Sequence, residues 1–148
     1  MEEHVIRPMQ IRDIPQAEEI DSLSFVTPWY KGSFSAELDN PVSISIVAET
    51  VQNRKIVGVL VAWLIVDELQ IATLAVHPTA RRLGISRKLM EYLMQYSREK
   101  GAKTAFLEVR AGNIAAQNLY QGFGFKVIDT RKNYYASEGE DALVMAWG

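Results

Sequence analysis

A basic, glycine-containing segment in the middle of the chain has the composition of an anion-binding turn. Residues 75–90 read AVHPTARRLGISRKLM, so an apolar stretch stops at His77-Pro78, crosses two arginines and Gly84, and resumes at helical spacing. The first N–H groups of a helix lack intrahelical partners, and the helix dipole favours an anion there. Gly84 permits a positive φ and a close approach of a ligand to the backbone. The segment is therefore either a phosphate cradle or an exposed basic helix start.

The predicted cradle has two sources of contacts. Backbone N–H groups would come from the turn and the first helical residues, and guanidinium groups would form charge-assisted hydrogen bonds to phosphate oxygens. The backbone donors are Arg82, Leu83, Gly84, Ile85, Ser86 and Arg87, and the side-chain donors are Arg81, Arg82 and Arg87.

A carboxylate inside a predicted strand is the second chemical candidate. Alternation along residues 103–110, KTAFLEVR, places three apolar side chains on one face and three others on the opposite face; these are Ala105, Leu107 and Val109, and Phe106, Glu108 and Arg110. Carboxylates are uncommon in strand interiors. Glu108 is therefore either paired with Arg110 on a partly solvated face or a general base, acting directly or through water.

Aromatic residues form the third group. Trp29 and Tyr30 lie in the predicted loop SFVTPWY, where a Pro-Trp pair is more often a packing anchor, whereas Tyr134 and Tyr135 lie among polar residues. Tyr120 would share a helix face with apolar neighbours, which by itself indicates a core tyrosine.

The periodicity of the chain predicts the elements that must position these residues. We expect strands at 4–9, 42–49, 56–66, 69–77, 103–110, 125–135 and 140–147. The first two helices are expected at 11–25 and 31–38. A third helix would contain the apolar stripe Leu89, Met90, Leu93 and Met94 and end at Gly101, and a fourth would run from Asn113 to Gly122 or Gly124. The first helix would have Asp13 as its N-cap and bury Ile14, Ala17, Ile20 and Leu23, while Asp67-Glu68 would form a turn. A meander followed by crossover helices implies a mixed α/β sheet with helices on both faces. The basic turn follows the fourth strand, where ligands of such sheets bind.

Composition limits the class of protein. The chain has 148 residues, which predicts a single domain over 1–148, and its net charge of −2 gives no overall attraction to nucleic acid. It has no cysteine, which excludes a thiolate nucleophile and thiolate metal sites and fits a cytoplasmic location. The two histidines make no metal pattern, and the longest apolar run, 56–66, is too short to span a membrane. We therefore expect neither a metal nor a membrane partner.

Three segments taken in order resemble the GNAT family of acetyl-CoA-dependent N-acetyltransferases, and within it the RimI-type protein N-terminal acetyltransferases. They are VHPTARRLGISRKLM, FLEVRAGNIAAQNLYQGFGF and YYASEGEDALVM. The resemblance implies the GNAT fold, a mixed and mostly antiparallel sheet of about seven strands flanked by about four helices on both faces. The family's turn has Arg or Gln, two residues, Gly, one residue, then Gly or Ala. Arg81 and Gly84 match, and Ser86 replaces the last residue, which implies altered rather than lost phosphate contacts.

The resemblance also implies roles for individual residues. Acetyl-CoA would be the cosubstrate, with its pyrophosphate at the basic turn and its pantetheine arm between splayed fourth and fifth strands. Main-chain contacts would come from Leu74, Ala75 and Val76, and further coenzyme contacts from Asn113 and Tyr120. Glu108 would be the general base that meets the acceptor, and Tyr120 the proton donor to the departing thiolate.

The implied acceptor is a protein N-terminal α-amine, typically a ribosomal-protein alanine. The loops that hold Trp29, Tyr30, Tyr134 and Tyr135 would flank it, and the enzyme would be a monomer or weak dimer. Two alternatives remain: the same chemistry on a lysine side chain or a small-molecule amine, and a coenzyme-binding regulator without catalysis. Because Glu108 and Tyr120 are both present, the resemblance favours an enzyme.

Overall fold

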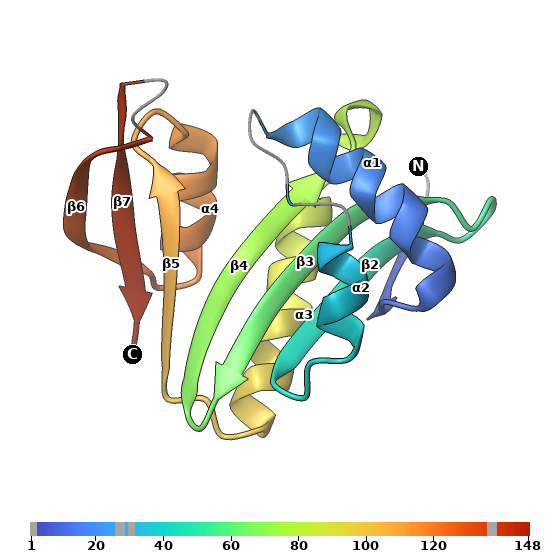
Figure 1. Ribbon diagram of the computed structural model, residues 1–148, viewed down its shortest axis with the longest axis horizontal. Coiled ribbons are helices and arrows are strands. Elements are labelled where there is room, and N and C mark those ends of the chain that lie inside the picture. Colours follow the sequence, from blue (N-terminus) through green and yellow to red (C-terminus); the bar gives the residue numbers. More distant parts are fainter. Residues whose placement is uncertain (1–2, 26–28, 30–31, 136–138) are drawn as a thin grey trace.

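The computed structural model describes residues 3–25, 29, 32–135 and 139–148 of the chain (Figure 1). The elements are β1 (His4–Pro8), a 3₁₀ turn η1 (Ile11–Asp13), α1 (Ile14–Ser24), α2 (Ser33–Leu38), β2 (Ser43–Thr50), β3 (Ile56–Ile65), β4 (Glu68–Val76), η2 (Pro78–Ala80), α3 (Ile85–Glu99), β5 (Thr104–Arg110), α4 (Ile114–Gly122), β6 (Lys126–Tyr135) and β7 (Glu140–Trp147). This order confirms the predicted succession of strands and helices.

The strands form one seven-stranded sheet in the order β1-β2-β3-β4-β5-β7-β6. Every neighbouring pair is antiparallel except β4 and β5, which run parallel. The two parallel strands pair only from Glu68–Gln70 to Thr104–Phe106, and in Figure 1 they diverge beyond that point. The mixed, mostly antiparallel sheet is confirmed, with its strands splayed at the carboxyl ends of β4 and β5.

Helices cover both faces of the sheet, as predicted. On one face the four residues of the apolar stripe of α3, Leu89, Met90, Leu93 and Met94, are all buried. The helix lies so close to β3 that a Cβ at Gly58 would come within 2.9 Å of Ile85. Gly101 follows α3 with φ +97°, a left-handed conformation that ends the helix as predicted.

The opposite face is covered in only one half. Ala17 and Ile20 of α1 and Phe34 of α2 pack with Val59 and Ala75 of the sheet. In Figure 1 both helices lie in front of the half of the sheet that contains β2 and β3, to one side of β5, β7 and β6. Side chains of β5 on this face are therefore left accessible beside the two helices.

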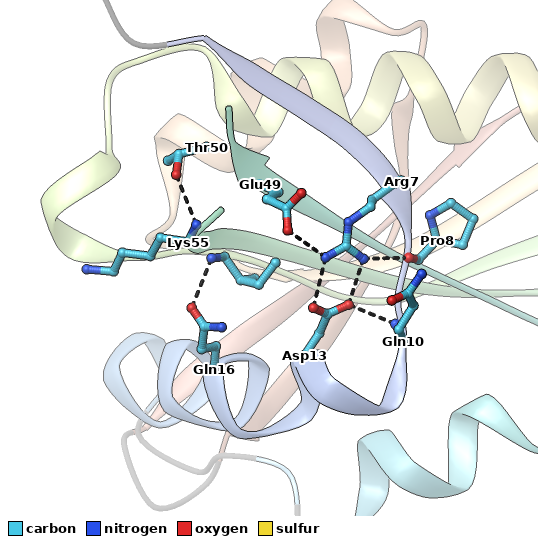
Figure 2. A network of polar contacts seen from close by, with 9 residues as sticks. Arg7, Pro8, Gln10, Asp13, Gln16, Glu49, Thr50 and Lys55 are labelled. Atoms are coloured by element: carbon cyan, nitrogen blue, oxygen red, sulfur yellow. Dashed lines mark hydrogen bonds and ion pairs between the residues drawn. The ribbon is translucent and has the colours of Figure 1, made fainter. Parts of the chain in front are cut away.

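Asp13 does not act as the predicted side-chain N-cap. It occupies the N-cap position of α1 without a cap hydrogen bond. Its carboxylate instead accepts two hydrogen bonds from Arg7, at 2.7 and 2.9 Å, and one from the N–H of Gln10, at 2.8 Å. Arg7 also donates to Glu49 at 2.8 Å (Figure 2), so this buried network ties β1, β2 and the start of α1 together.

Two other predictions are wrong at element boundaries. Leu23 is 52% exposed, because the buried side of α1 runs through Ala17, Ile20 and Asp21. Val66 is 90% exposed with φ +60°, because it and Asp67 form the tight turn between β3 and β4; Glu68 already belongs to β4. The predicted start of the second helix, Lys31, lies outside the described residues. In the described part of the chain, no helix is long and apolar enough to cross a membrane.

Candidate active site

The basic turn after β4 has the backbone conformation that the glycine predicted. His77 accepts a hydrogen bond from the N–H of Thr79 at 3.2 Å, and η2 follows. Arg82 and Gly84 both adopt left-handed conformations, with φ of +67° and +77°. A Cβ at Gly84 would meet no heavy atom within 4 Å, so the space beside this residue is open to a ligand.

The donors of the turn fit a phosphate group. α3 begins at Ile85 without a side-chain cap, and the N–H of Lys88 donates to the carbonyl of Gly84 at 3.1 Å. The N–H groups of Ile85, Ser86 and Arg87 therefore have no helical acceptor. Arg82 and Leu83 precede the helix, so any contacts they make come from the turn itself.

The arginines add positive charge to this helix start. The side chains of Arg81, Arg82 and Arg87 are exposed, and none forms an ion pair with another described residue. Arg81 donates from Nε to the carbonyl of Val76 at 3.3 Å, which attaches the turn to the end of β4. An anion at this position would gain from both the helix dipole and the guanidinium groups.

The main chain of β4 presents alternate residues to the splayed side. His77 N–H donates to the Val57 carbonyl at 2.8 Å, so these opposed residues form a hydrogen-bonded pair of the antiparallel ladder. Such pairs alternate along a ladder. The main-chain groups of Leu74 and Val76 consequently point away from β3 toward the space beside β5, whereas those of Ala75 point to β3. The register therefore supports the predicted contacts for Leu74 and Val76 and offers none for the main chain of Ala75.

Glu108 lies on β5 beyond the last residue paired with β4, and its side chain is 32% exposed. Its Oε1 is 3.0 Å from Nη1 of Arg131 on β6. The predicted alternative of a Glu108–Arg110 pair is wrong, because Arg110 pairs with Glu140 at 3.1 Å. Leu107 and Val109 are buried on the opposite face, as the alternation of β5 predicted.

Arg131 was not predicted, and it reaches Glu108 across one intervening strand. Glu108 is opposite Val144 of β7, and Val144 is opposite Asp129 of β6. Arg131 is two residues beyond Asp129 and therefore on the same face of the sheet. The register of β6 is shifted at Ile128, and no spacing in the sequence indicates this shift.

Tyr120 approaches the end of β5 from the other face of the sheet. It is 8% exposed and belongs to the same apolar cluster as Leu107 and Val109. Burial raises the pKa of Tyr120 to about 12, so the phenol keeps its proton at neutral pH. Among the described residues, its hydroxyl forms no hydrogen bond that would compete with a ligand. Asn113 begins α4 as predicted, and its Oδ1 accepts from Ala116 N–H at 3.1 Å.

The structure brings the two tyrosines of the last hairpin to Glu108. The Tyr134 and Tyr135 rings contact each other edge to face at 5.2 Å. Arg110 lies 3.8 Å above Tyr135, and Arg131 lies 5.5 Å from the Tyr134 ring centre. Burial raises the pKa of Tyr135; Arg110 acts in the opposite direction, and the charge of Glu108 adds to the increase. Tyr134 therefore lies beside the arginine that pairs with Glu108, and Tyr135 beside Arg110.

Trp29 has the role of a packing anchor. Its ring is 5.0 Å from that of Phe34, and its backbone N–H donates to Asp21 Oδ2 at 2.7 Å. Asp21 is itself buried, and burial raises its pKa, although the bond from Trp29 acts in the opposite direction. Asp21 was not singled out from the sequence, because the spacing of the apolar residues of α1 gives no sign that this carboxylate is buried. Tyr30 lies outside the described residues.

Comparisons with known proteins identify the class. Residues 13–125 match the acetyltransferase (GNAT) family. The chain belongs to this family, which confirms the resemblance found in its sequence.

Particular relatives extend the match over nearly the whole chain. A Bacillus subtilis protein, provisionally named as a ribosomal protein bS18-alanine N-acetyltransferase, is 38% identical over 141 residues, 95% of this chain and 92% of that protein. The Escherichia coli K12 ribosomal protein bS18-alanine N-acetyltransferase is 32% identical over 97% of this chain and 96% of its own. The E. coli crystal structure superimposes with a TM-score of 0.88, over 97% of this chain and 92% of that one. Arabidopsis thaliana NAA60 in complex with acetyl-CoA has a TM-score of 0.86 at 20% identity, over 98% of both chains, and shares the fold.

Proposed function

We propose that this acetyltransferase moves the acetyl group of acetyl-CoA to the N-terminal α-amine of a protein, with a ribosomal-protein alanine as the first acceptor to test. The observation that carries the proposal is the placement of Glu108 and Tyr120 on opposite sides of β5, where β4 separates from it. The relatives named for bS18 alanine acetylation, which match over nearly the full chain, support the choice of acceptor.

The coenzyme would bind along the end of β4 and the turn that follows. Its pyrophosphate would accept hydrogen bonds from the N–H groups of Ile85, Ser86 and Arg87. The main chain of Leu74 and Val76 would pair with the pantetheine arm, and an N–H there would polarise the thioester carbonyl. Acetyl-CoA supplies an activated acyl group, and the protein supplies orientation and proton transfer.

Glu108 would handle the proton of the attacking amine. A peptide α-amine has a pKa near 8, so roughly a tenth of it is neutral at pH 7, compared with about 0.04% of a lysine side chain. An N-terminal acceptor therefore demands little of its base, and Glu108 can act directly or through one water molecule. The chain has no cysteine to form an acyl-enzyme, so the amine would attack the acetyl carbonyl directly.

Tyr120 would serve the leaving sulfur. Its pKa of about 12 lies roughly 3.5 units above that of an ordinary thiol, so full transfer to a solvated thiolate is unfavourable by about 5 kcal/mol. The same apolar surroundings raise the proton affinity of a thiolate formed beside it. Tyr120 therefore acts by donating a hydrogen bond that strengthens as negative charge develops on sulfur.

The test is acetyl-CoA turnover with three acceptors: peptides beginning with alanine or serine, the same peptides blocked at the N-terminus but containing lysine, and a polyamine. Mass spectrometry locates the acetyl group. The expected product is acetylated at the α-amine, with little reaction of the blocked peptide. Acetylation confined to lysine or the polyamine would assign another acceptor, and coenzyme binding without turnover would assign the regulator.

A further inference from the structure

The general base proposed above is already paired with a cation of the same chain. Glu108 Oε1 lies 3.0 Å from Arg131 Nη1, while the two side chains are 32% and 50% exposed. Arg131 comes from β6, the edge strand of the sheet, and its other recorded partner is the ring of Tyr134 at 5.5 Å. A second arginine nearby, Arg110, is held by Glu140 and stacks on Tyr135.

At neutral pH an acceptor amine is mostly an ammonium ion, and this cation would pair with the same carboxylate, that of Glu108. A guanidinium and an ammonium on one partly buried carboxylate would leave an excess positive charge and repel each other. Of the two arginines, Arg131 can be displaced with the smaller loss of free energy, because it is half-exposed on an edge strand and, among the described residues, its side chain pairs only with Glu108 and the Tyr134 ring.

We propose that Arg131 is a specificity-determining residue whose guanidinium pairs with Glu108 in the free enzyme, where the acceptor ammonium would pair after it binds. Binding of a cationic amine exchanges one cation for another at Glu108 and releases Arg131 toward solvent over Tyr134. An uncharged ligand cannot make this exchange, so the pair favours acceptors that arrive protonated. The inference rests on the proposed function, because it assumes that the amine meets Glu108.

The exchange predicts a change in acceptor affinity without a change in the chemical step. Arg131→Gln removes the internal competitor, so the KM for an alanine-initiated peptide should fall about 2- to 5-fold, the range expected for a partly exposed ion pair, while kcat stays within about 2-fold. Arg131→Lys keeps a cation and should remain close to wild type. Lys132→Gln is the matched control: it removes the same charge from the next residue, whose side chain is 84% exposed and pairs with Asp141 at 3.5 Å.

Ionic strength provides a readout that a purely structural role would not move. In the wild type, salt weakens both the internal pair and the acceptor pair, so peptide affinity should depend only shallowly on salt. In Arg131→Gln only the acceptor pair remains, so the same salt series should weaken binding more steeply. Calorimetric titration of the peptide into the enzyme with coenzyme A measures this slope without turnover, and thermal unfolding verifies that each variant is folded.

Particular results would overturn the exchange. A folded Arg131→Gln variant with unchanged or raised KM, with a lower kcat at constant KM, or with the wild-type salt slope would show that Arg131 only supports the strand or orients the base. Failure of the proposed function looks different, because the wild type itself would then leave the α-amine unmodified. In that event the same variants, assayed with whichever amine is acetylated, still test the exchange.

Discussion

Replacement of Tyr120 by phenylalanine tests the burial of the phenol and its chemical role in one variant. The folded-state pKa of about 12 exceeds the ordinary value of about 10, because burial disfavours the phenolate. Since the folded protein holds this proton more tightly than the unfolded chain, the associated stability is complete below pH 10. It is lost as the pH rises from about 10 toward 12.

The size of the effect follows from the shift. Two pKa units at 1.36 kcal/mol each correspond to about 3 kcal/mol of unfolding free energy, which is lost in full only above pH 12. Tyr120→Phe removes the titrating group, so its unfolding free energy should decline by about 2 kcal/mol less than that of the wild type between pH 9 and pH 12, where the folded-state phenol is half ionised. Urea unfolding at each pH measures the difference. Tyr96→Phe, at a 37% exposed position on α3, is the control for hydroxyl removal.

Kinetics complete the test of Tyr120. Coenzyme affinity should be retained, because the proposed pyrophosphate and pantetheine contacts come from the turn and from β4, while kcat should fall by about 10²-fold, a typical cost of removing one hydrogen-bond donor to a developing anion. The loss should shrink with an acyl donor whose thiol is more acidic. If the unfolding free energies of variant and wild type declined equally between pH 9 and pH 12, the raised pKa of buried Tyr120 would be refuted. A loss of kcat that is the same for every leaving group would refute the role at sulfur.

Three further outcomes follow from other parts of the structure. Gly84→Asp should weaken acetyl-CoA binding at least tenfold by calorimetry, because it adds a negative charge where phosphate would lie. Gly84→Asn is the neutral control; asparagine tolerates the φ of +77°, so this variant should lose much less acetyl-CoA affinity. Equal losses of affinity in the two variants would indicate backbone strain instead. Glu108→Gln should reduce acetylation most at low pH, where the acceptor is protonated, and recover partly as pH rises; a uniform loss across pH would contradict its role as base. Asp13→Asn should lower the unfolding free energy at pH 7 by about 2 kcal/mol, because half-buried Arg7 loses one of its two carboxylate partners and keeps only Glu49. Desolvation opposes the ionised form of Asp13, but the Arg7 and Gln10 hydrogen bonds lower its pKa. In urea unfolding this difference should therefore shrink as the pH falls through the ordinary carboxyl pKa of about 4 and disappear only below the lowered pKa of the folded state; a difference that persisted there would contradict the ion pair.

The parts of the fold that follow a simple periodicity could be predicted from the sequence. The stripe of α3 repeats at helical spacing, and the alternation of β5 assigns Leu107 and Glu108 to opposite faces. Gly84 and Gly101 could be assigned left-handed conformations because each lies at the border between a loop and a helix. In these cases the local pattern and the tertiary packing demand the same residue.

Contacts that depend on register could not be predicted. The Glu108–Arg131 pair joins residues on strands separated by β7, and the shift at Ile128 sets which side chain of β6 reaches the carboxylate. Asp13 was assigned as a helix cap from its local sequence. In the structure, Arg7 instead donates two charge-assisted hydrogen bonds to the Asp13 carboxylate, and these replace the bond to the helix N-terminus.

The separation of the proposed base and acid follows from the chain path around β5. Alternation directs Glu108 to the face beside α1 and α2, and the connection to α4 carries Tyr120 to the opposite face, only twelve residues later. Because the sheet lies between them, these groups have no direct route to exchange a proton with each other. β4 and β5 are not paired beyond Gln70 and Phe106, so a substrate bound between the two strands there would contact both faces of the sheet. An amine could therefore lose its proton to Glu108 on one side while sulfur gains a hydrogen bond from Tyr120 on the other, and no proton need pass between Glu108 and Tyr120.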